Sequence, residues 1–177
     1  PLQAFQGVAV SAFLKQQHRP AAAFVKPAAA VLGIGAVGAA AAYLIGPLLF
    51  KLIYPPKGDA QAAYAEVVTG TVLGVLVFAS ALLALMTLSG NMVLAINRHR
   101  AYVAGWAAAA AVAVAVAFFA PLPLVPRAIA ALCVGPVCGF AVHLAAMMVH
   151  ARSVQALSEG EALREMLVEN TVRGETH

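Results

Sequence analysis

The sequence predicts an all-α protein, a polytopic membrane helix bundle of four transmembrane helices with both termini in the cytoplasm. Three observations support this fold class. Of the 177 residues, 63% are hydrophobic and 10% are charged, whereas soluble domains have about 45–50% apolar and about 25% charged residues. The mean hydropathy of +0.89 would leave large apolar patches exposed to water. Four apolar runs reach the roughly 20 residues that a helix needs to cross a bilayer.

The first 26 residues are expected to form the end of a truncated span and an interfacial segment. The run 1–14 is apolar but too short to cross a bilayer, and the chain begins with Pro1 instead of Met. We therefore interpret the chain as a fragment whose missing part lies upstream. Pro27 is expected at an early position of the first span, where its missing N–H costs least.

The membrane domain is expected to cover residues 27–150. Its connections contain the Pro, Gly and Asp residues that are typical of turns, so consecutive spans should be antiparallel neighbours. The four spans are predicted at residues 27–53, 66–96, 101–120 and 126–149.

Residues 151–177 are expected to form a cytoplasmic tail. Ser158 and Glu161 have the spacing of a capping box ahead of several apolar residues. This spacing predicts a short amphipathic helix that begins at Ser158. A weakly ordered polar tail is the alternative.

The distribution of Lys and Arg predicts the orientation, because cytoplasmic loops carry an excess of these residues. Eight of the eleven fall on the side of the first segment, and the other three are Lys51, Lys57 and Arg127. We therefore place that first side in the cytoplasm and the chain in the inner membrane of a bacterium, in contact with membrane lipids. Nucleic acid is not an expected partner, since the basic residues form no patch interleaved with aromatic ones. The eight are Lys15, Arg19, Lys26, Arg98, Arg100, Arg152, Arg164 and Arg173.

Two GxxxG pairs predict close helix packing, because each pair places two glycines on one face of a helix. Gly70 and Gly74 lie in the second span, and Gly135 and Gly139 lie in the fourth. The contacts could lie within the bundle or between protomers. Pro136 is expected to kink the fourth span and to serve as a hinge.

Two further patterns are interpreted as packing residues. The GxGxxG match at residues 33–38 lacks the preceding strand and the following acidic residue of a dinucleotide site. Cys133 and Cys138 lie within one apolar run at a spacing that suits neither a zinc site nor a disulfide. No cofactor and no metal are expected.

Polar residues within the spans are few. No Asp, Glu, Lys or Arg lies at the centre of a span, where ion-coupled pumps usually carry one. Thr87 and Asn91 share a helix face and could line a substrate pathway, with His143 as a titratable switch. Interhelical hydrogen bonds and a packing histidine are the favoured interpretations. Nothing resembles a set of catalytic residues, so an enzyme is not expected.

Two segments resemble a known family. Gly46–Tyr54 (GPLLFKLIY) resembles its small-Pro-Leu-Leu-x-x-Leu-hydrophobic-aromatic span end, and Leu94–Arg100 (LAINRHR) resembles its Leu-Ala-x-Gly-Arg-x-Arg exit from the next span, with Asn97 where Gly is commoner. These two segments carry most of the resemblance, which extends up to Arg152: the chain resembles the C-terminal part of a polysaccharide-biosynthesis membrane protein. That family is the lipid-linked oligosaccharide flippases of the multidrug/oligosaccharidyl-lipid/polysaccharide exporter superfamily.

The resemblance implies that the chain is the last third of a two-lobed transporter and that an N-terminal lobe is missing. The implied substrate is a polyprenyl-diphosphate-linked glycan, and its cationic binding residues would lie mostly in earlier spans. Arg98 and Arg100 would meet lipid phosphates at the cytoplasmic face, or would serve only as a topology signal. The alternatives are a multidrug or metabolite exporter of the same superfamily, and a four-span anchor or assembly subunit without transport.

Overall fold

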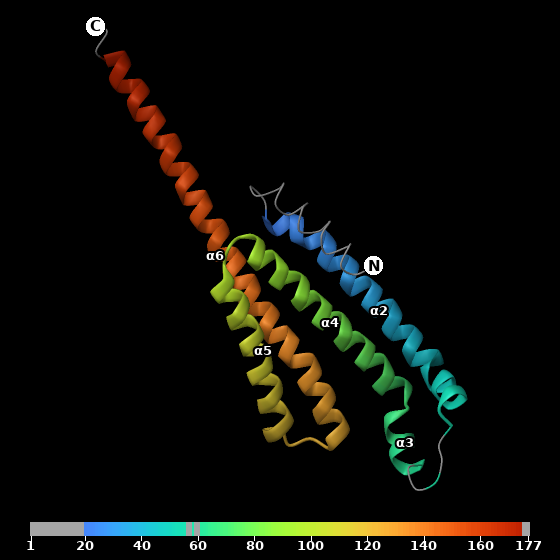
Figure 1. Ribbon diagram of the computed structural model, residues 1–177. Coiled ribbons are helices and arrows are strands. Elements are labelled where there is room, and N and C mark those ends of the chain that lie inside the picture. Colours follow the sequence, from blue (N-terminus) through green and yellow to red (C-terminus); the bar gives the residue numbers. More distant parts are fainter. Residues whose placement is uncertain (1–19, 56–57, 59–60, 175–177) are drawn as a thin grey trace.

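The computed structural model describes residues 20–55, 58 and 61–174, and all regular elements within these ranges are helices (Figure 1). Four of the helices are long and apolar enough to cross a membrane, as the sequence predicts. The apolar run 1–14 lies outside the described residues. The helices are α2 (Pro20–Ile53), α3 (Gln61–Val67), α4 (Gly70–Ala95), α5 (His99–Phe119) and α6 (Leu124–Gly174).

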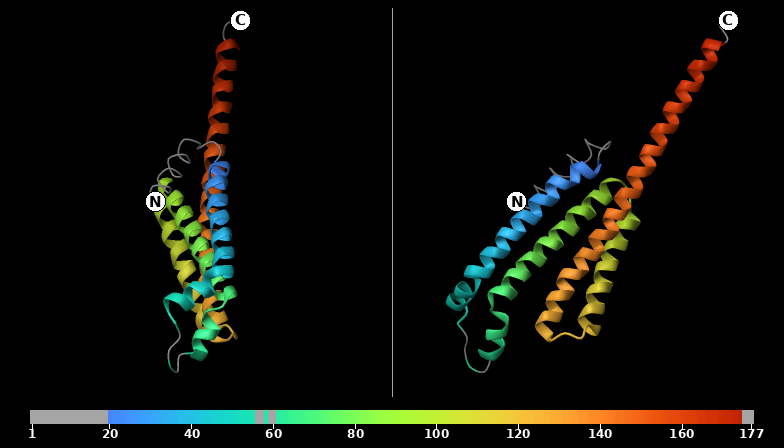
Figure 2. Two further views of the ribbon diagram at one scale, coloured as in Figure 1. Left: turned by 90° about the vertical axis from the view of Figure 1, so that its right-hand side faces the viewer. Right: turned by 180° about the vertical axis from the view of Figure 1, so that it is seen from behind.

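Helix α4 is the central element of the bundle. It packs against α2 on one side and against α6 on the other, while α5 packs mainly against α6 (Figure 2). In the most apolar window of α4, 39% of the residues are buried, against 11% in α2 and in α5. The bundle thus consists of two antiparallel pairs, α2 with α4 and α5 with α6, that meet between α4 and α6.

Two helices begin several residues away from the starts predicted for their spans. Helix α2 begins at Pro20, so that Pro20 takes the first position and Pro27 lies inside the helix. Helix α4 begins at Gly70 instead of Glu66, because the Thr69 hydroxyl accepts a hydrogen bond from the Val72 N–H at 3.3 Å and caps the helix there. Glu66 belongs to the short separate helix α3.

The separate tail helix predicted to begin at Ser158 is not formed. Helix α6 is continuous from Leu124 to Gly174 and projects well beyond the other helices (Figure 1). Ser158 does not cap a new helix, because its hydroxyl donates to the Gln155 carbonyl within α6. The helix also continues through Pro136.

Glycines bring α2 and α4 together. A Cβ atom at Gly74 would lie 3.0 Å from the Ala39 carbonyl oxygen, and one at Gly70 would clash with the Tyr43 carbonyl. Pro47 has no N–H to donate to that carbonyl, so Gly70 lies against a backbone oxygen that lacks its helical partner. Gly70 and Gly74 thus lie against the backbone of α2 within the same chain.

The second GxxxG pair serves the contact between α5 and α6. A Cβ atom at Gly135 would lie 2.9 Å from the Ala109 carbonyl oxygen, and one at Gly139 would lie 2.8 Å from the Gly105 carbonyl oxygen. Small residues on both helices thus allow the two backbones to approach closely, which is how helices associate in lipid.

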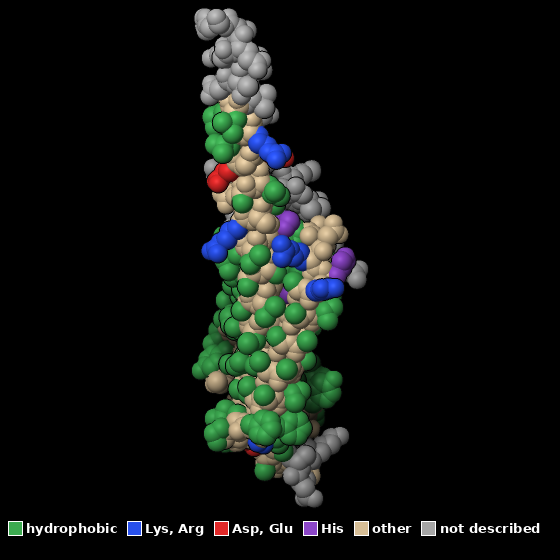
Figure 3. All heavy atoms as spheres, turned by 90° about the vertical axis from the view of Figure 1, so that its left-hand side faces the viewer, with side chains coloured by type: hydrophobic (Ala, Val, Ile, Leu, Met, Phe, Trp, Pro, Cys, Tyr) green, Lys and Arg blue, Asp and Glu red, His purple; other side chains and the backbone are tan. Residues whose placement is uncertain are grey.

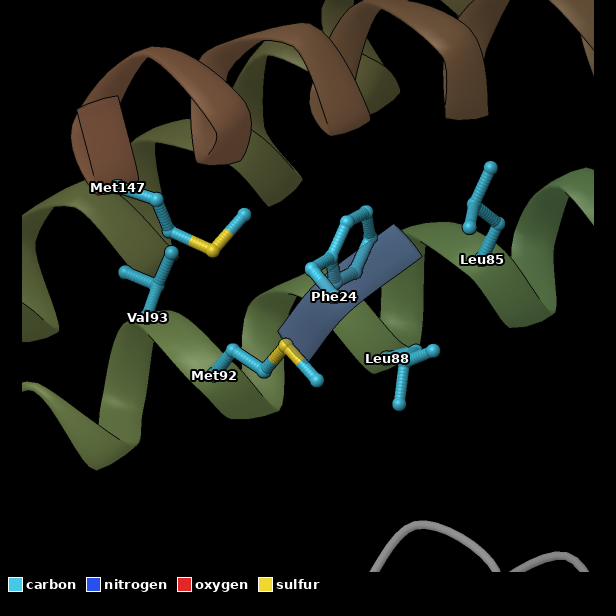
Figure 4. Close-up of a cluster of buried hydrophobic side chains, with 6 residues drawn as sticks. All are labelled: Phe24, Leu85, Leu88, Met92, Val93 and Met147. Atoms are coloured by element: carbon cyan, nitrogen blue, oxygen red, sulfur yellow. The ribbon is translucent and has the colours of Figure 1, made fainter. Parts of the chain in front are cut away.

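A cluster of apolar side chains fills the space between the two helix pairs. Met92 and Val93 of α4 are fully buried, and they lie with Met147 of α6 and Phe24 of α2 (Figure 4). By contrast, large apolar side chains on the outer faces of α2 and α5 are exposed, such as Leu52 and Phe119. Both features fit a lipid environment. Lipid tails solvate the apolar side chains on the outer faces about as well as the interior of the bundle solvates the buried ones.

Gly139→Ala and Gly33→Ala are a matched test of this packing. We expect Gly139→Ala to lower the free energy of unfolding by about 1–3 kcal/mol, because its new methyl group would overpack the α5 backbone. A Cβ atom at Gly33 would have no neighbour within 4 Å, so Gly33→Ala should raise the free energy of unfolding by up to about 1 kcal/mol through helix propensity. Thermal unfolding of the full-length protein in detergent measures the stability of both variants, and equal changes in stability would contradict the packing.

Candidate functional site

A buried polar pair lies where α4, α5 and α6 meet. His143 of α6 and Ser89 of α4 have no exposed surface, and they are the buried polar side chains within the described ranges. Their burial in an otherwise apolar bundle requires hydrogen-bond partners, because an unpaired polar group in lipid costs several kcal/mol. This pair is therefore the candidate functional site.

His143 joins all three helices through its two ring nitrogens. Nδ1 lies 3.0 Å from the Ser89 hydroxyl, and Nε2 lies 3.2 Å from the Tyr102 carbonyl oxygen of α5. Both contacts form when Nε2–H donates to the Tyr102 carbonyl and the Ser89 hydroxyl donates to Nδ1. The same hydroxyl lies 2.7 Å from the Met86 carbonyl oxygen of its own helix, so its one hydrogen can serve either acceptor.

Glycines and an aromatic ring shape the space around the imidazole. The Tyr102 ring stacks on the His143 ring with centroids 6.0 Å apart and an interplanar angle of 3°. A Cβ atom at Gly105 would clash with the His143 ring, and one at Gly90 would lie 3.1 Å from its Cε1. His143 thus occupies a space that exists because α4 and α5 each place a glycine there.

The two other residues expected on a substrate pathway do not join this site. The Thr87 hydroxyl donates to the Leu83 carbonyl at 2.9 Å within α4, and Asn91 is half-buried on the same helix. His143 instead contacts Ser89 and Gly90, which lie between them in the sequence. The Thr87 hydroxyl therefore does not form the interhelical hydrogen bond that the sequence favoured for it. A pathway role for Thr87, Asn91 and His143 stays a prediction.

Tyr102, Gly90 and Gly105 are parts of the site that the sequence did not indicate. Gly105 is the one glycine of α5 and faces the one histidine within the apolar part of α6. An isolated glycine in a helix that is otherwise rich in Ala and Val is the signal that could have located the contact.

The turn between α4 and α5 carries the basic residues Arg98 and Arg100. Here the Arg98 N–H donates to the Val93 carbonyl and the Asn97 N–H donates to the Leu94 carbonyl, which is the hydrogen-bond pattern of a Schellman motif. Asn97 has a φ of +57°, the left-handed conformation that this motif requires and that Asn adopts more easily than other non-glycine residues. Arg98 is half-buried and Arg100 is exposed.

Basic side chains gather at this end of the bundle. On the face shown in Figure 3, Lys, Arg and His side chains form a band beyond a largely hydrophobic surface. We call this region the basic end and define it by Lys26, Arg98, Arg100 and Arg152. Between Glu66 and Glu159 the sequence contains no acidic residue, so the charge at the basic end has no acidic partner nearby in the chain.

The remaining candidate groups form no reactive centre. Cys133 and Cys138 are free and half-buried in α6. Among the described residues, no group of three or more His, Cys, Asp or Glu side chains could hold a metal ion. The chemistry that the site supports is hydrogen bonding between helices.

A double-mutant cycle tests the bond between Ser89 and His143. We expect Ser89→Ala and His143→Leu each to destabilise the protein, with a coupling free energy of about 0.6 kcal/mol, the average for interhelical hydrogen bonds in membranes, and at most about 1.7 kcal/mol. Thr87→Ala is the matched control, because its hydroxyl bonds within α4 and should show no coupling to His143→Leu. Unfolding of the full-length protein in mixed micelles gives all the values, and a coupling of zero for the Ser89 cycle would contradict the bond.

Substitution of Asn97 tests the turn at the basic end. Asn97→Gly should leave the stability nearly unchanged, because glycine adopts positive φ readily. Asn97→Ala should cost about 1–2 kcal/mol, since its Cβ disfavours the left-handed conformation. Similar melting temperatures for the two variants would show that the turn does not hold Asn97 in this conformation.

Comparisons with known proteins find only uncharacterized relatives. The uncharacterized protein Rv1510 of Mycobacterium tuberculosis is 38% identical over 147 residues, which are 83% of this chain and 32% of the relative. Rv3630 of the same species and Mb3654 of Mycobacterium bovis, both also uncharacterized, are each 33% identical over the same shares. No family profile and no solved structure matches the chain. The chain spans about a third of the length of the curated relatives that it matches.

Proposed function

We propose that this chain supplies four spans of one lobe of a transporter that moves a polyprenyl-diphosphate-linked glycan across the cytoplasmic membrane. The observation that carries the proposal is the conformation of Asn97. The resemblance to the oligosaccharide flippases places glycine at this position, and the backbone there has a φ of +57°. Asn is the residue that replaces glycine in this conformation at least cost, so the substitution keeps the turn.

The surface of the bundle is also consistent with part of a larger membrane protein. Along α2, residues Ile34, Val37 and Leu44 are more than 70% exposed, and α2 is covered by α4 on one side only. The curated relatives are about three times as long as the matched segment. Further spans of a longer chain could cover the outer face of α2, as the missing lobe of a transporter would.

The packing suggests which parts would move relative to each other. The glycine contacts hold α2 against α4 and α5 against α6, so each pair is expected to move as one unit. The contact of α6 with α4 includes the hydrogen bond between His143 and Ser89. In this proposal, alternating access is a rocking of one pair against the other about that bond, and Pro136 between Gly135 and Gly139 gives α6 a point of flexure.

Deletion of the full-length gene from its host tests the function. We expect export of the glycan to stop and its lipid-linked precursor to accumulate on the cytoplasmic side, where membrane-impermeant glycosidases added outside do not reach it. The full-length gene should restore export, and a version that lacks residues 27–150 should not.

The control variants use the packing described above. Gly33→Ala should complement fully, while replacement of Gly139 by leucine should reduce export at an equal level of protein in the membrane. Unchanged glycan export after deletion would overturn the proposal. Greater sensitivity to toxic compounds without accumulation of the precursor would favour the multidrug or metabolite exporter, and loss of a partner protein from the membrane would favour the assembly subunit.

A further inference from the structure

A groove runs between α2 and α6 at the basic end. Its volume is about 440 Å³, within the range of small-molecule sites. The groove exists because α2 and α6 make little direct contact, each being held by other neighbours. Its walls are apolar side chains: Phe24, Val25, Ala28, Ala29 and Leu32 of α2, and Phe140, Leu144, Met147, Met148 and Ala151 of α6.

Aromatic and small residues together shape the groove. The rings of Phe24 and Phe140 stack with centroids 5.8 Å apart and connect the two helices across it. Ala28 and Ala29 on α2 and Ala151 on α6 have short side chains, which leave the space between the helices open. The result is an apolar groove between the two helices, suited to a hydrocarbon chain and not to a polar solute.

The depth of the groove matches one leaflet of a bilayer. From Phe24 to Leu32, α2 rises about 12 Å. Half of the hydrocarbon core of a bilayer is about 15 Å thick. Lys26 lies among the first groove residues of α2, and Arg152 directly follows the last groove residue of α6. The groove therefore begins near the level of the lipid headgroups and ends near the middle of the membrane.

Charge at the mouth of the groove favours an anion. Lys26 directly follows the groove residue Val25, and Arg152 directly follows the groove residue Ala151; both side chains are exposed. His150 adds a titratable group on α6, and Arg98 and Arg100 lie at the same end. The nearest acidic residue of α6 is Glu159, about two helical turns beyond Arg152.

The geometry points to a binding site for an anionic phospholipid, with one acyl chain in the groove between α2 and α6 and the phosphate held by Lys26 and Arg152. Two features of the groove favour this ligand. The groove is apolar and about one leaflet deep, and the cations at the basic end have no acidic neighbour. Such a lipid fills the space that α2 and α6 leave between them and holds the two helices together. It is a resident of the protein, separate from any transported glycan.

Photolabelling of the full-length protein tests the site. The protein is placed in phosphatidylcholine vesicles that contain phosphatidylglycerol with a diazirine in its acyl chain, and the labelled peptides are mapped by mass spectrometry. We expect the label within residues 24–32 and 140–151. Phosphatidylcholine with the same diazirine should label these peptides about 30-fold less, since Lys26 and Arg152 near the headgroup each contribute about 1 kcal/mol.

Two pairs of variants separate the groove from its surroundings. Ala29→Phe fills the groove and should reduce labelling about tenfold, since it removes the space for two or more methylene groups. Ala30→Phe, at an exposed position outside the groove, should label like the wild type. Lys26→Gln with Arg152→Gln should abolish the preference for phosphatidylglycerol, whereas Lys51→Gln with Arg127→Gln at the opposite end should keep it.

Three results would overturn the proposed site. The first is that Ala29→Phe is labelled as strongly as the wild type, and the second is that the two phospholipids label equally. The third is that the wild type is not labelled, because another segment of the full-length chain fills the groove. Displacement of the label by polyprenyl phosphate would assign the groove to the carrier lipid instead. The melting temperatures of Ala29→Phe and Ala30→Phe are compared first. A loss of label then counts only if the variant is as well folded as its control.

Discussion

Close approach of helix backbones at small residues is the constraint on which the rest of this bundle depends. In lipid, apolar side chains gain little by leaving their surroundings, so helices associate through packing and a few hydrogen bonds. Gly74 against Ala39 and Gly139 against Gly105 bring the backbones together. The buried imidazole of His143 then finds its partners on both neighbouring helices, because Gly90 and Gly105 leave space for it.

The parts of the fold that could be predicted from the sequence are those set by the solvent. Length and hydropathy are enough to identify four helices that are long and apolar enough to cross a membrane, since a bilayer imposes one minimum length on all of them. The GxxxG pairs also indicated packing, because a glycine on a lipid-embedded face has few other uses. The helix boundaries were less predictable. The division at Thr69 depends on one capping hydroxyl, and α6 continues past Arg152 through Gly160 in a stretch that contains no proline.

The site could be predicted only in part, for a physical reason. His143 is conspicuous as a polar residue in an apolar span. Its partners, however, are a serine two helices earlier in the sequence and a backbone carbonyl, which any residue could supply. The position of Asn97 is different, because the conformation of its own backbone explains its type. Local conformation is encoded locally, whereas contacts between helices depend on how the helices are arranged in space.

The continuous helix α6 has a mechanical consequence. From Arg152 to Gly174 it extends about 33 Å beyond the bundle as one helix that no other described long helix accompanies (Figure 1). A lever of this length amplifies motion: a tilt of about 10° at the level of His143 would displace the far end by about 8 Å, roughly one and a half helical turns. A small rearrangement in the membrane would thus be transmitted as a large movement outside it, along a single piece of secondary structure.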